Sequence, residues 1–282
     1  MILALHNMRA CARNLKGVTN AQADSTLIVS VVTLSVPVVA RAGFINGGFE
    51  TGDLTGWTRL GRGEVIGVFQ GLVPPPEGSK QGFLSTEGSG DLFPVSDSTL
   101  ESGLGLSSGF LDNFIRTLAG DNNLNATEGS AIYQDITVAL GDVIFFRWDF
   151  VTNELHHGKQ FDDFVFVIVR VPTTPSPTIH AFGTDKRNST GMFPFSNPGF
   201  AGFDGHTGYQ TFLFGPVTVA GTYRIAVGVM DVGDTIVESV VLVDNFFVGP
   251  LSEIIPEPST LALAATAIGI GFVCHLRRRT AV

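Results

Sequence analysis

The amino-acid sequence predicts an all-β protein, an antiparallel β-sandwich, between two short apolar end segments. The central part of the chain consists of short apolar runs separated by clusters of Gly, Pro, Asn and Asp, and the chain contains 34 Gly and 14 Pro. This pattern is typical of strands joined by turns. In several runs the large apolar side chains occupy every second position, as in strands with one buried face. The roughly 210 residues between the ends suit a single sandwich domain.

The clearest strands are expected at 64–70, 81–86, 131–138, 143–151, 164–170, 209–214, 222–230 and 237–248. The runs 131–138 and 143–151 are separated only by a short turn, which predicts a hairpin. Alternation places four large side chains of the second run on one core-facing side: Ile144, Phe146, Trp148 and Phe150. In the run 222–230, the core-facing side begins at Tyr223. The run 164–170 is apolar at nearly every position, which predicts a strand covered on both faces.

Three further segments complete the domain. Apolar residues at 109–118 recur at helical spacing, which predicts a short helix. The Ser- and Gly-rich stretch 92–108 is expected to be a loop, and a second long loop is expected at 184–207. That second loop carries four phenylalanines, which either pack down or meet a partner: Phe193, Phe195, Phe200 and Phe203. The layout of strands best matches a jelly roll with a core of Phe, Val and Ile.

Residues 1–42 have the features of a secretory signal peptide. Basic residues in the first sixteen positions precede an apolar run at 27–39, and Ala40-Arg41-Ala42 supplies a small-residue cleavage site. The pattern predicts a signal helix that directs export, with translation starting at Met1 or Met8. The alternative is an uncleaved anchor, which needs a longer apolar run.

The C-terminal end consists of a linker at 251–258 and a segment at 259–282. The linker contains Pro256, Glu257 and Pro258, and the segment is apolar until Arg277, Arg278 and Arg279. The apolar part predicts a short transmembrane helix. The positive-inside rule keeps the arginines cytoplasmic, so the domain at 43–250 lies outside the cytoplasm.

This order of Pro-Glu-Pro, apolar segment and arginine cluster resembles the PEP-CTERM sorting signal of Gram-negative bacteria. The resemblance implies an inner-membrane-anchored precursor. An exosortase-type membrane peptidase would then cut it near Pro-Glu-Pro and release it toward the cell surface or the medium. A marginal anchor without processing is the alternative, since Gly269 and Gly271 lower the helix propensity of the tail.

Cysteine content and charge exclude some classes of protein. Both cysteines, Cys11 and Cys274, lie in the two ends, so no disulfide can stabilise the central domain. Between Gly43 and Ile255 the net charge is −14 (10 Lys and Arg against 24 Asp and Glu). An acidic domain of this kind is not expected to bind nucleic acid, because phosphate contacts need positive charge. It suits extracellular calcium better.

A calcium site is expected from two motifs at opposite ends of the domain. Asn46-Gly47-Gly48-Phe49-Glu50 follows the predicted cleavage site, and Asp244-Asn245 lies in the last predicted strand. Together they resemble the galactose-binding-like jelly roll found in many carbohydrate-binding modules, in which such segments meet at a structural Ca²⁺ ion. The resemblance implies that Glu50 and Asp244 supply side-chain oxygens and Gly48 a backbone carbonyl. The alternative is a simple turn beside a solvated Glu50.

A second acidic set lies at predicted strand ends, at Glu154, Asp163, Asp231 and Asp234. Strand ends of a sandwich converge, so these carboxylates would repel one another unless a cation neutralised them. The alternative is a set of solvated loop carboxylates. A zinc site at His156-His157 would need further ligands, and the H-E-x-x-H pattern is absent.

Two further patterns bear on function. Gly105-Leu106-Ser107-Ser108-Gly109 matches the G-x-S-x-G string, but it lies in a Ser/Gly loop of a β-rich chain rather than between a strand and a helix. Flat aromatic rings that could stack on sugars are Trp57, Tyr133, Trp148, Tyr209 and Tyr223. Most of these are expected to be structural, because Trp148 and Tyr223 belong to core faces.

The sequence therefore predicts an exported, non-catalytic surface or matrix protein that is stabilised by calcium and binds extracellular polysaccharide. One alternative is a secreted polysaccharide hydrolase that uses a carboxylate pair such as Glu154 and Asp163. Another is a purely structural or adhesive protein without a small ligand. The sequence does not separate the first hypothesis from the last.

Overall fold

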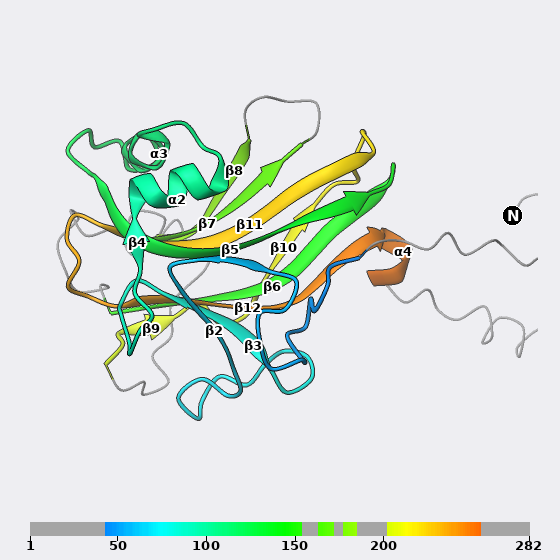
Figure 1. The fold of residues 1–282 in the computed structure, drawn as a ribbon, viewed down its shortest axis with the longest axis horizontal. Helices are drawn as coiled ribbons and strands as arrows, with labels where there is room; N and C mark the ends of the chain where they lie inside the picture. The colour runs from blue at the N-terminus through cyan, green and yellow to red at the C-terminus, as the bar shows by residue number, and fades with distance from the viewer. Residues whose placement is uncertain (1–42, 154–162, 172–176, 185–201, 255–282) are drawn as a thin grey trace, which may run out of the picture. The chain divides into compact units, whose positions relative to one another are not determined.

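The computed structural model describes residues 43–153, 163–171, 177–184 and 202–254. These residues form two antiparallel sheets packed face to face, with two helices on the outer side of one sheet (Figure 1). The predicted all-β sandwich is therefore confirmed for this part of the chain. No helix of the described residues is long and apolar enough to cross a membrane. The predicted signal and tail helices lie outside these residues.

The first sheet, sheet A, is the one nearer the helices (Figure 1). Its neighbouring strands are, in order, β1 (Thr58–Leu60), β5 (Ala126–Val138), β11 (Gly221–Val232), β7 (Phe164–Arg170) and β8 (Thr178–Thr184), and β4 (Val95–Ser96) also pairs with β5. Sheet B contains, in order, β10 (Gln210–Phe214), β6 (Asp142–Thr152), β12 (Ser239–Pro250), β3 (Gln81–Ser85) and β2 (Arg62–Ile66), and β9 (Gly205–His206) pairs with β6. A short helix, α4 (Leu251–Ile254), follows β12.

The hairpin expected between the strands at 131–138 and 143–151 is wrong. Strand β5 pairs with strands of sheet A, whereas β6 pairs with strands of sheet B. The turn between them passes from one sheet to the other. It is held by the Asp142 carboxylate, which accepts a hydrogen bond from Ala139 N (2.9 Å), and by Gly141 N, which donates to Val217 O (2.9 Å). Each strand has one strongly apolar face, and placing the strands in opposite sheets lets both faces enter the same core.

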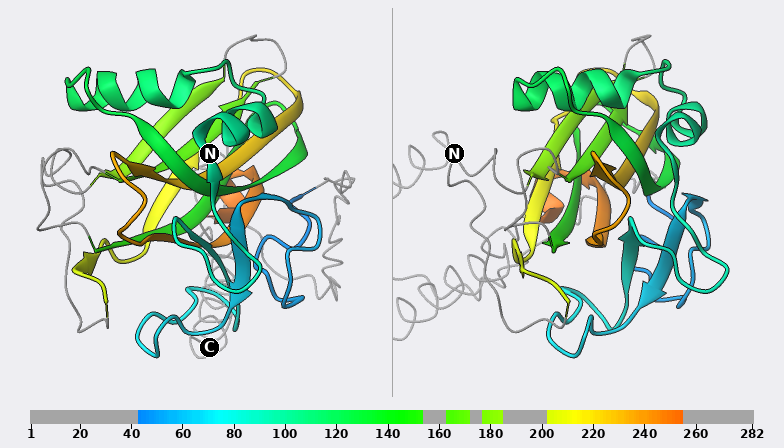
Figure 2. Two further views of the ribbon diagram at one scale, coloured as in Figure 1. Left: turned by 60° about the vertical axis from the view of Figure 1, so that its left-hand side comes forward. Right: turned by 90° about the vertical axis from the view of Figure 1, so that its left-hand side faces the viewer.

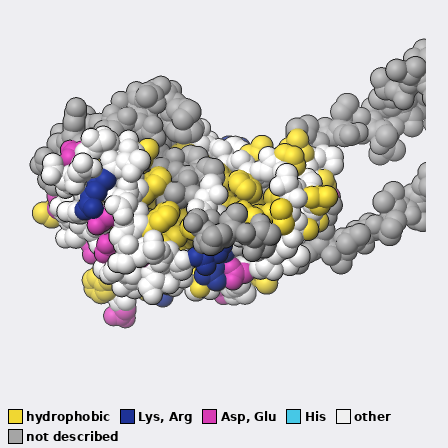
Figure 3. Space-filling model, turned by 90° about the horizontal axis from the view of Figure 1, so that it is seen from above, with side chains coloured by type: hydrophobic (Ala, Val, Ile, Leu, Met, Phe, Trp, Pro, Cys, Tyr) yellow, Lys and Arg dark blue, Asp and Glu magenta, His cyan; other side chains and the backbone are white. Residues whose placement is uncertain are grey.

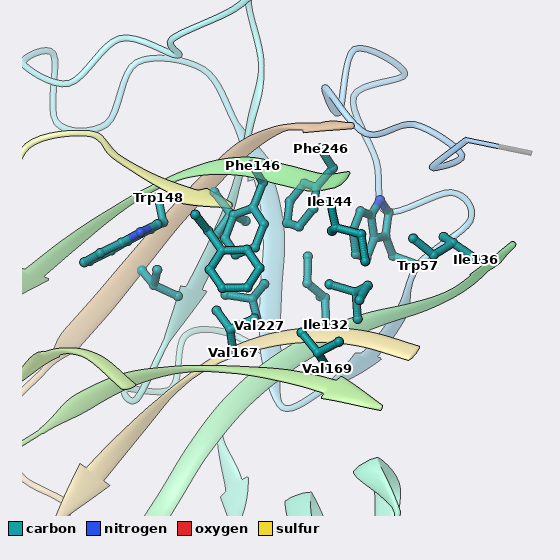
Figure 4. Close-up of a cluster of buried hydrophobic side chains, with 14 of the residues drawn as sticks. Trp57, Ile132, Ile136, Ile144, Phe146, Trp148, Val167, Val169, Val227 and Phe246 are labelled. Atoms are coloured by element: carbon teal, nitrogen blue, oxygen red, sulfur yellow. The ribbon is translucent and has the colours of Figure 1, made fainter. Parts of the chain in front are cut away.

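The core between the sheets follows the alternation predicted from the sequence. Ile144, Phe146, Trp148 and Phe150 are all fully buried in it. Figure 4 shows Phe146 and Trp148 opposite Val167 and Val227, which belong to sheet A. Tyr223 is 2% exposed in the same cluster. The predicted core assignment of Trp148 and Tyr223 is thus confirmed.

Strand β7 is covered on both faces, as its apolar sequence predicts. Val165, Val167 and Val169 enter the core between the sheets, while Phe164 and Phe166 enter a second cluster beneath the helices. Helix α3 (Phe110–Ala119) confirms the predicted helix at 109–118. On this helix-covered side, acidic and basic side chains lie beside one another in small groups (Figure 3).

The stretch 92–108 is not a loop, contrary to expectation. It contains β4 and helix α2 (Asp97–Leu104), whose Leu100 and Leu104 are fully buried against sheet A. Ser96 caps the helix by accepting a hydrogen bond from Thr99 N, and Gly105 ends it in the left-handed region. The Ser and Gly content thus reflects helix caps as well as a loop.

Other strand limits differ from the expected ones. Strand β8 was not expected at all, and it pairs along β7. The loop expected at 184–207 includes the last residue of β8 and all of β9, and its residues 185–201 lie outside the described ones. In β12, the pairing register with β6 shifts between Asp244 and Phe247, so this strand carries a bulge.

Alternate residues of β3 and β12 face opposite sides of sheet B. Leu84 and Val241 enter the core between the sheets, whereas Phe83, Val240 and Leu242 form a third cluster with Phe69, Val73 and Phe203 on the outer side. Loop segments after β2 and before β9 therefore cover part of this outer face. They lie on the side opposite the helices (Figure 2).

Candidate functional site

An aromatic cluster fixes the N-terminal segment against the bulge of β12. Phe246 lies at ring-centroid distances of 5.2 Å from Phe44, 6.0 Å from Phe49 and 4.6 Å from Trp57. Phe246 N also donates a hydrogen bond to Gly47 O (3.0 Å). A side chain at Gly47 would overlap the Phe246 carbonyl oxygen, so the two backbones approach closely only because residue 47 is glycine.

The three residues predicted to bind calcium lie together at this junction. A Cβ atom built on Gly48 would be 3.9 Å from Asp244 Oδ1 and 3.9 Å from the Glu50 Cγ atom. Asp244 is fully buried, and Gly48 and Glu50 approach it from the N-terminal segment. The structure thus brings together residues from the two ends of the domain.

The Glu50 carboxylate binds the loop that precedes β3. Its Oε1 atom accepts hydrogen bonds from Ser79 N (2.8 Å) and Lys80 N (2.9 Å), and Oε2 accepts one from Ser79 Oγ (3.0 Å). The backbone N–H of Ser79 is the main cause that lowers the pKa of Glu50 below its ordinary value. Glu50 is therefore ionised at neutral pH, and its exposed carboxylate is held by these hydrogen bonds from Ser79 and Lys80.

Asp244 is in the opposite electrostatic situation. Burial, followed by the nearby carboxylates of Glu77 and Glu50, raises the pKa of Asp244 to about 7, although Asn245 N (2.7 Å) and Glu77 N (3.2 Å) donate hydrogen bonds to it. A buried carboxylate among other carboxylates favours the neutral form unless a cation is added. A divalent ion at this position would hold Asp244 ionised.

The oxygen atoms that the junction offers as metal ligands are of the kind that calcium prefers. Two carboxylates and a backbone carbonyl are hard oxygen ligands, and Ca²⁺ takes six to eight such ligands, with carbonyls and water among them. No three His, Cys, Asp or Glu side chains within the described ranges are grouped as ligands of one metal ion. A calcium ion here would therefore depend on carbonyls and water beside Glu50 and Asp244. Calcium binding by Gly48, Glu50 and Asp244 stays a prediction.

Backbone strain gathers at this junction and at one other place. Among the described residues, left-handed backbone at non-glycine positions occurs at Asn46 (φ 52°), Phe49 (φ 56°), Asn245 (φ 55°) and Gln70 (φ 47°). Three of these belong to the two predicted calcium motifs. Such conformations cost free energy and tend to cluster at functional sites. Gln70 marks a second candidate site.

That second site is a pocket of about 370 Å³ on the outer side of sheet B. Its polar lining comes from Arg62, Glu64, Gln70 and Glu238, and its apolar lining from Ile66, Val68, Phe69, Phe83 and Phe203. No sequence pattern singled out this pocket. Its residues come from β2, β3, the turn before β12 and two loops, and only Phe203 was noted as a candidate contact. The structure packs this phenylalanine down, since it is 7% exposed.

A buried polar group on the same side of sheet B was also missed. Asp149, which is fully buried, contacts His206 Nδ1 (2.7 Å) and accepts a hydrogen bond from Thr207 Oγ1 (3.1 Å). Burial and the carboxylates of Asp149 and Asp244 raise the pKa of Tyr209, whose hydroxyl donates to Gln81 Oε1. The signal was available, because alternation in β6 places Asp149 away from the central core.

The second acidic set is only partly brought together. Asp163 and Asp231 are buried at the same end of sheet A, where Asp163 Oδ1 accepts a hydrogen bond from Val232 N (2.9 Å). Asp234 lies on the following turn, and its Oδ1 accepts from Ile236 N (2.9 Å). Glu154 lies outside the described residues, as do His156 and His157. A second metal site, and a carboxylate pair of Glu154 and Asp163, stay predictions.

The aromatic side chains considered as sugar platforms are engaged within the protein. Trp57 and Trp148 are buried together with Tyr223, the Arg224 guanidinium lies 4.2 Å from the centre of the Tyr133 ring, and Tyr209 is half-buried. The G-x-S-x-G string lies between two helices, with Gly105 ending α2 and Gly109 preceding α3. Ser107 is thus in a helix–helix connection and not at a strand-to-helix turn.

Comparisons with known proteins found similarity only among solved structures: no family model matches the chain, and neither does any curated protein. A structure of TmCBM61 in complex with beta-1,4-galactotriose has a TM-score of 0.40 and 10% identity, over 75% of this chain and 99% of that one. Carbohydrate-binding modules from the beta-sandwich super family have a TM-score of 0.34 and 12% identity, over 72% of this chain and 60% of that one. The enzymatically active domain of Bacteriophage CBA120 tailspike protein 4 has a TM-score of 0.34 and 9% identity, over 73% of this chain and 21% of that one. Similarities this weak carry no argument about ligand or activity.

Proposed function

We propose that the chain is an exported, non-catalytic surface or matrix protein whose β-sandwich binds extracellular polysaccharide and is stabilised by calcium. The observation that carries the binding proposal is the pocket of about 370 Å³ on the outer side of sheet B. Its volume lies within the range of small-ligand pockets, roughly 300–1,000 Å³. Phenylalanine rings and charged hydrogen-bonding groups line it together.

This lining suits a sugar because a pyranose has apolar C–H faces and a polar hydroxyl edge. Phe69, Phe83 and Phe203 pack together as the apolar floor of the pocket, with Phe69 at 5.9 Å from Phe83 and 5.8 Å from Phe203 between centroids. Val68, which is 53% exposed, offers accessible apolar surface beside them. Glu64, whose side chain is 40% exposed, offers a carboxylate to ligand hydroxyls. A few placed polar groups beside apolar walls are typical of small-ligand sites.

Binding is tested by titration calorimetry with the full chain, in a detergent without a sugar headgroup, against a panel of soluble polysaccharides. Val68 is 53% exposed at the pocket, so Val68→Arg is expected to abolish binding while leaving the fold intact. Leu213, which is 52% exposed on β10, gives the matched control Leu213→Arg. Saturable binding that survives Val68→Arg contradicts the pocket assignment. No saturable binding to any glycan contradicts polysaccharide binding.

Calcium stabilisation rests on the junction of Gly48, Glu50 and Asp244. Asp244 is fully buried and its pKa is raised. The atoms that the three residues would offer to a metal ion are all oxygens. A bound divalent cation would offset the repulsion among the carboxylates. Thermal unfolding with calcium and with chelator tests this part of the proposal, and loss of the response in Asp244→Asn assigns it to this site.

Export and sorting rest on the two ends of the sequence. The signal at 1–42 and the tail from Pro256 to Arg279 give the chain an exported domain with a membrane-anchored precursor, and the partner that cuts it is an exosortase-type peptidase. Mass spectrometry of the released protein should find a C-terminus near Pro256. Replacement of Pro256, Glu257 and Pro258 by alanine should leave the full-length form in the membrane fraction. Released protein that still contains Arg277 would contradict processing.

A further inference from the structure

We infer that the pocket on the outer side of sheet B selects uncharged pyranose units and rejects uronic acids. The inference rests on the proposed polysaccharide binding and adds the charge class of the ligand. It is carried by the contacts of Arg62, which is the arginine that lines the pocket.

The guanidinium of Arg62 is already used by the protein. Its Nε atom lies 3.3 Å from Glu64 Oε1, and its Nη1 atom lies 3.4 Å from Glu238 Oε1. The same Nη1 donates to Glu87 O (2.9 Å) and lies 3.5 Å from Ser85 Oγ. Arg62 is thus fixed by partners on three segments of the chain. A ligand carboxylate would have to compete with two protein carboxylates for it.

The position of Arg62 over an aromatic ring strengthens this arrangement. The guanidinium carbon lies 5.0 Å from the centre of the Phe83 ring, and the arginine side chain is only 14% exposed. The aromatic ring and the two carboxylates all stabilise the guanidinium in this position, so moving it toward a ligand would cost free energy. Arg62 therefore acts as a fixed donor at the pocket rather than as a mobile anion clamp.

The charges at the pocket also disfavour an anionic ligand. Two glutamates face one arginine there, so an incoming carboxylate meets no uncompensated positive charge. Burial raises the pKa of Glu238 and the nearby Glu87 raises it further, while the hydrogen bond from Ser85 and the charge of Arg62 lower it. The positive charge of Arg62 thus already offsets the cost of a partly buried carboxylate at this position. Hydroxyl groups have no such penalty, since they donate to carboxylates and accept from a guanidinium.

The test compares neutral oligosaccharides of β-glucan, β-galactan and β-mannan with the same oligosaccharides oxidised to carboxylates at C6. Titration calorimetry with the full chain should give a Kd at least tenfold lower for a neutral oligosaccharide than for its oxidised form. The double variant Glu64→Gln/Glu238→Gln leaves the charge of Arg62 uncompensated and should shift this ratio at least tenfold toward the oxidised form. Glu253→Gln, on α4 at the far end of β12 from Glu238, is the matched control and should leave the ratio unchanged.

The outcomes separate the inference from the proposed function. Equal or tighter binding of the oxidised form by the unmodified chain overturns the inference while polysaccharide binding stands. An unchanged ratio in the double variant overturns it as well. If that variant does not fold, Glu64→Gln alone, at a 40% exposed side chain, should still shift the ratio severalfold. No binding of any oligosaccharide in either form overturns the proposed function together with the inference.

Discussion

Replacing Asp244 by asparagine should remove a large pH dependence from the stability of the calcium-free protein. The folded-state pKa of Asp244 is about 7, against an ordinary value of 3.8. Each unit of pKa difference corresponds to about 1.4 kcal/mol, so the buried carboxylate costs roughly 4 kcal/mol when it is fully ionised. Because the pKa of Asp244 is raised in the folded state, the carboxyl is protonated below about pH 4 and does not lower the free energy of unfolding there. The free energy of unfolding then falls as the pH rises from about 4 through 7. About 3 kcal/mol of this loss falls between pH 5 and pH 8.

The assay is urea unfolding at pH 5 and pH 8, with chelator and with calcium. In chelator, the free energy of unfolding of the unmodified chain should fall by about 3 kcal/mol more than that of Asp244→Asn between the two pH values. Calcium at a hundredfold excess over its Kd should restore about 2.7 kcal/mol at pH 8 in the unmodified chain only. Asp142→Asn, which changes another buried aspartate, should keep the calcium response.

Two results would refute the reasoning in different ways. Equal pH dependence of the unmodified chain and Asp244→Asn in chelator would mean that the Asp244 carboxylate is not disfavoured in the folded protein. A full pH effect without any response to calcium would support the disfavoured Asp244 carboxylate but contradict calcium binding at this site.

Further predictions concern packing and buried polar contacts. Gly47→Ala should destabilise the domain by about 1–3 kcal/mol in urea unfolding, because the added methyl overlaps the Phe246 carbonyl, whereas Gly43→Ala, with nothing within 4 Å, should be neutral. Phe246→Ala should cost about 3–5 kcal/mol, because its ring is 7% exposed among Phe44, Phe49, Trp57 and Phe146, and a similar loss in Phe93→Ala, at a 63% exposed ring, would contradict that reason. Asp149→Asn should cost about 1–3 kcal/mol through its contacts with His206 and Thr207, with exposed Asp91→Asn as the control. An unchanged urea midpoint in Asp149→Asn would show that these buried contacts are not needed.

Local chemistry in the sequence was a reliable guide to strand faces and a poor guide to strand partners. Alternation in β6 identified Phe146 and Trp148 as core residues, because only one face of a strand can meet the other sheet. The short turn after β5 carried no information about whether β6 would pair with it or cross to the other sheet. That choice depends on which strands complete each sheet, and those come from distant segments such as β11 and β12.

Composition was also a weaker guide than specific cap positions. The Ser and Gly content of 92–108 predicted a loop, but Ser96 and Gly105 are the two ends of α2. Leu100 and Leu104 are spaced one helical turn apart, so both side chains can pack against sheet A, and this burial stabilises α2. A helix of this length has little stability without such packing.

By itself, the sequence determined the strand faces, the helix α3 and the residue types gathered at the predicted calcium motif, because those features depend on neighbours along the chain. The resemblance to the galactose-binding-like jelly roll implied that Glu50 and Asp244 lie near each other, but only the tertiary structure placed them beside Gly48, since the contact of Phe246 with the N-terminal segment joins opposite ends of the domain. The tertiary structure also decided the pocket around Arg62. The pocket exists because β2, β3 and two loops converge on the outer side of sheet B, and no single segment carries that arrangement.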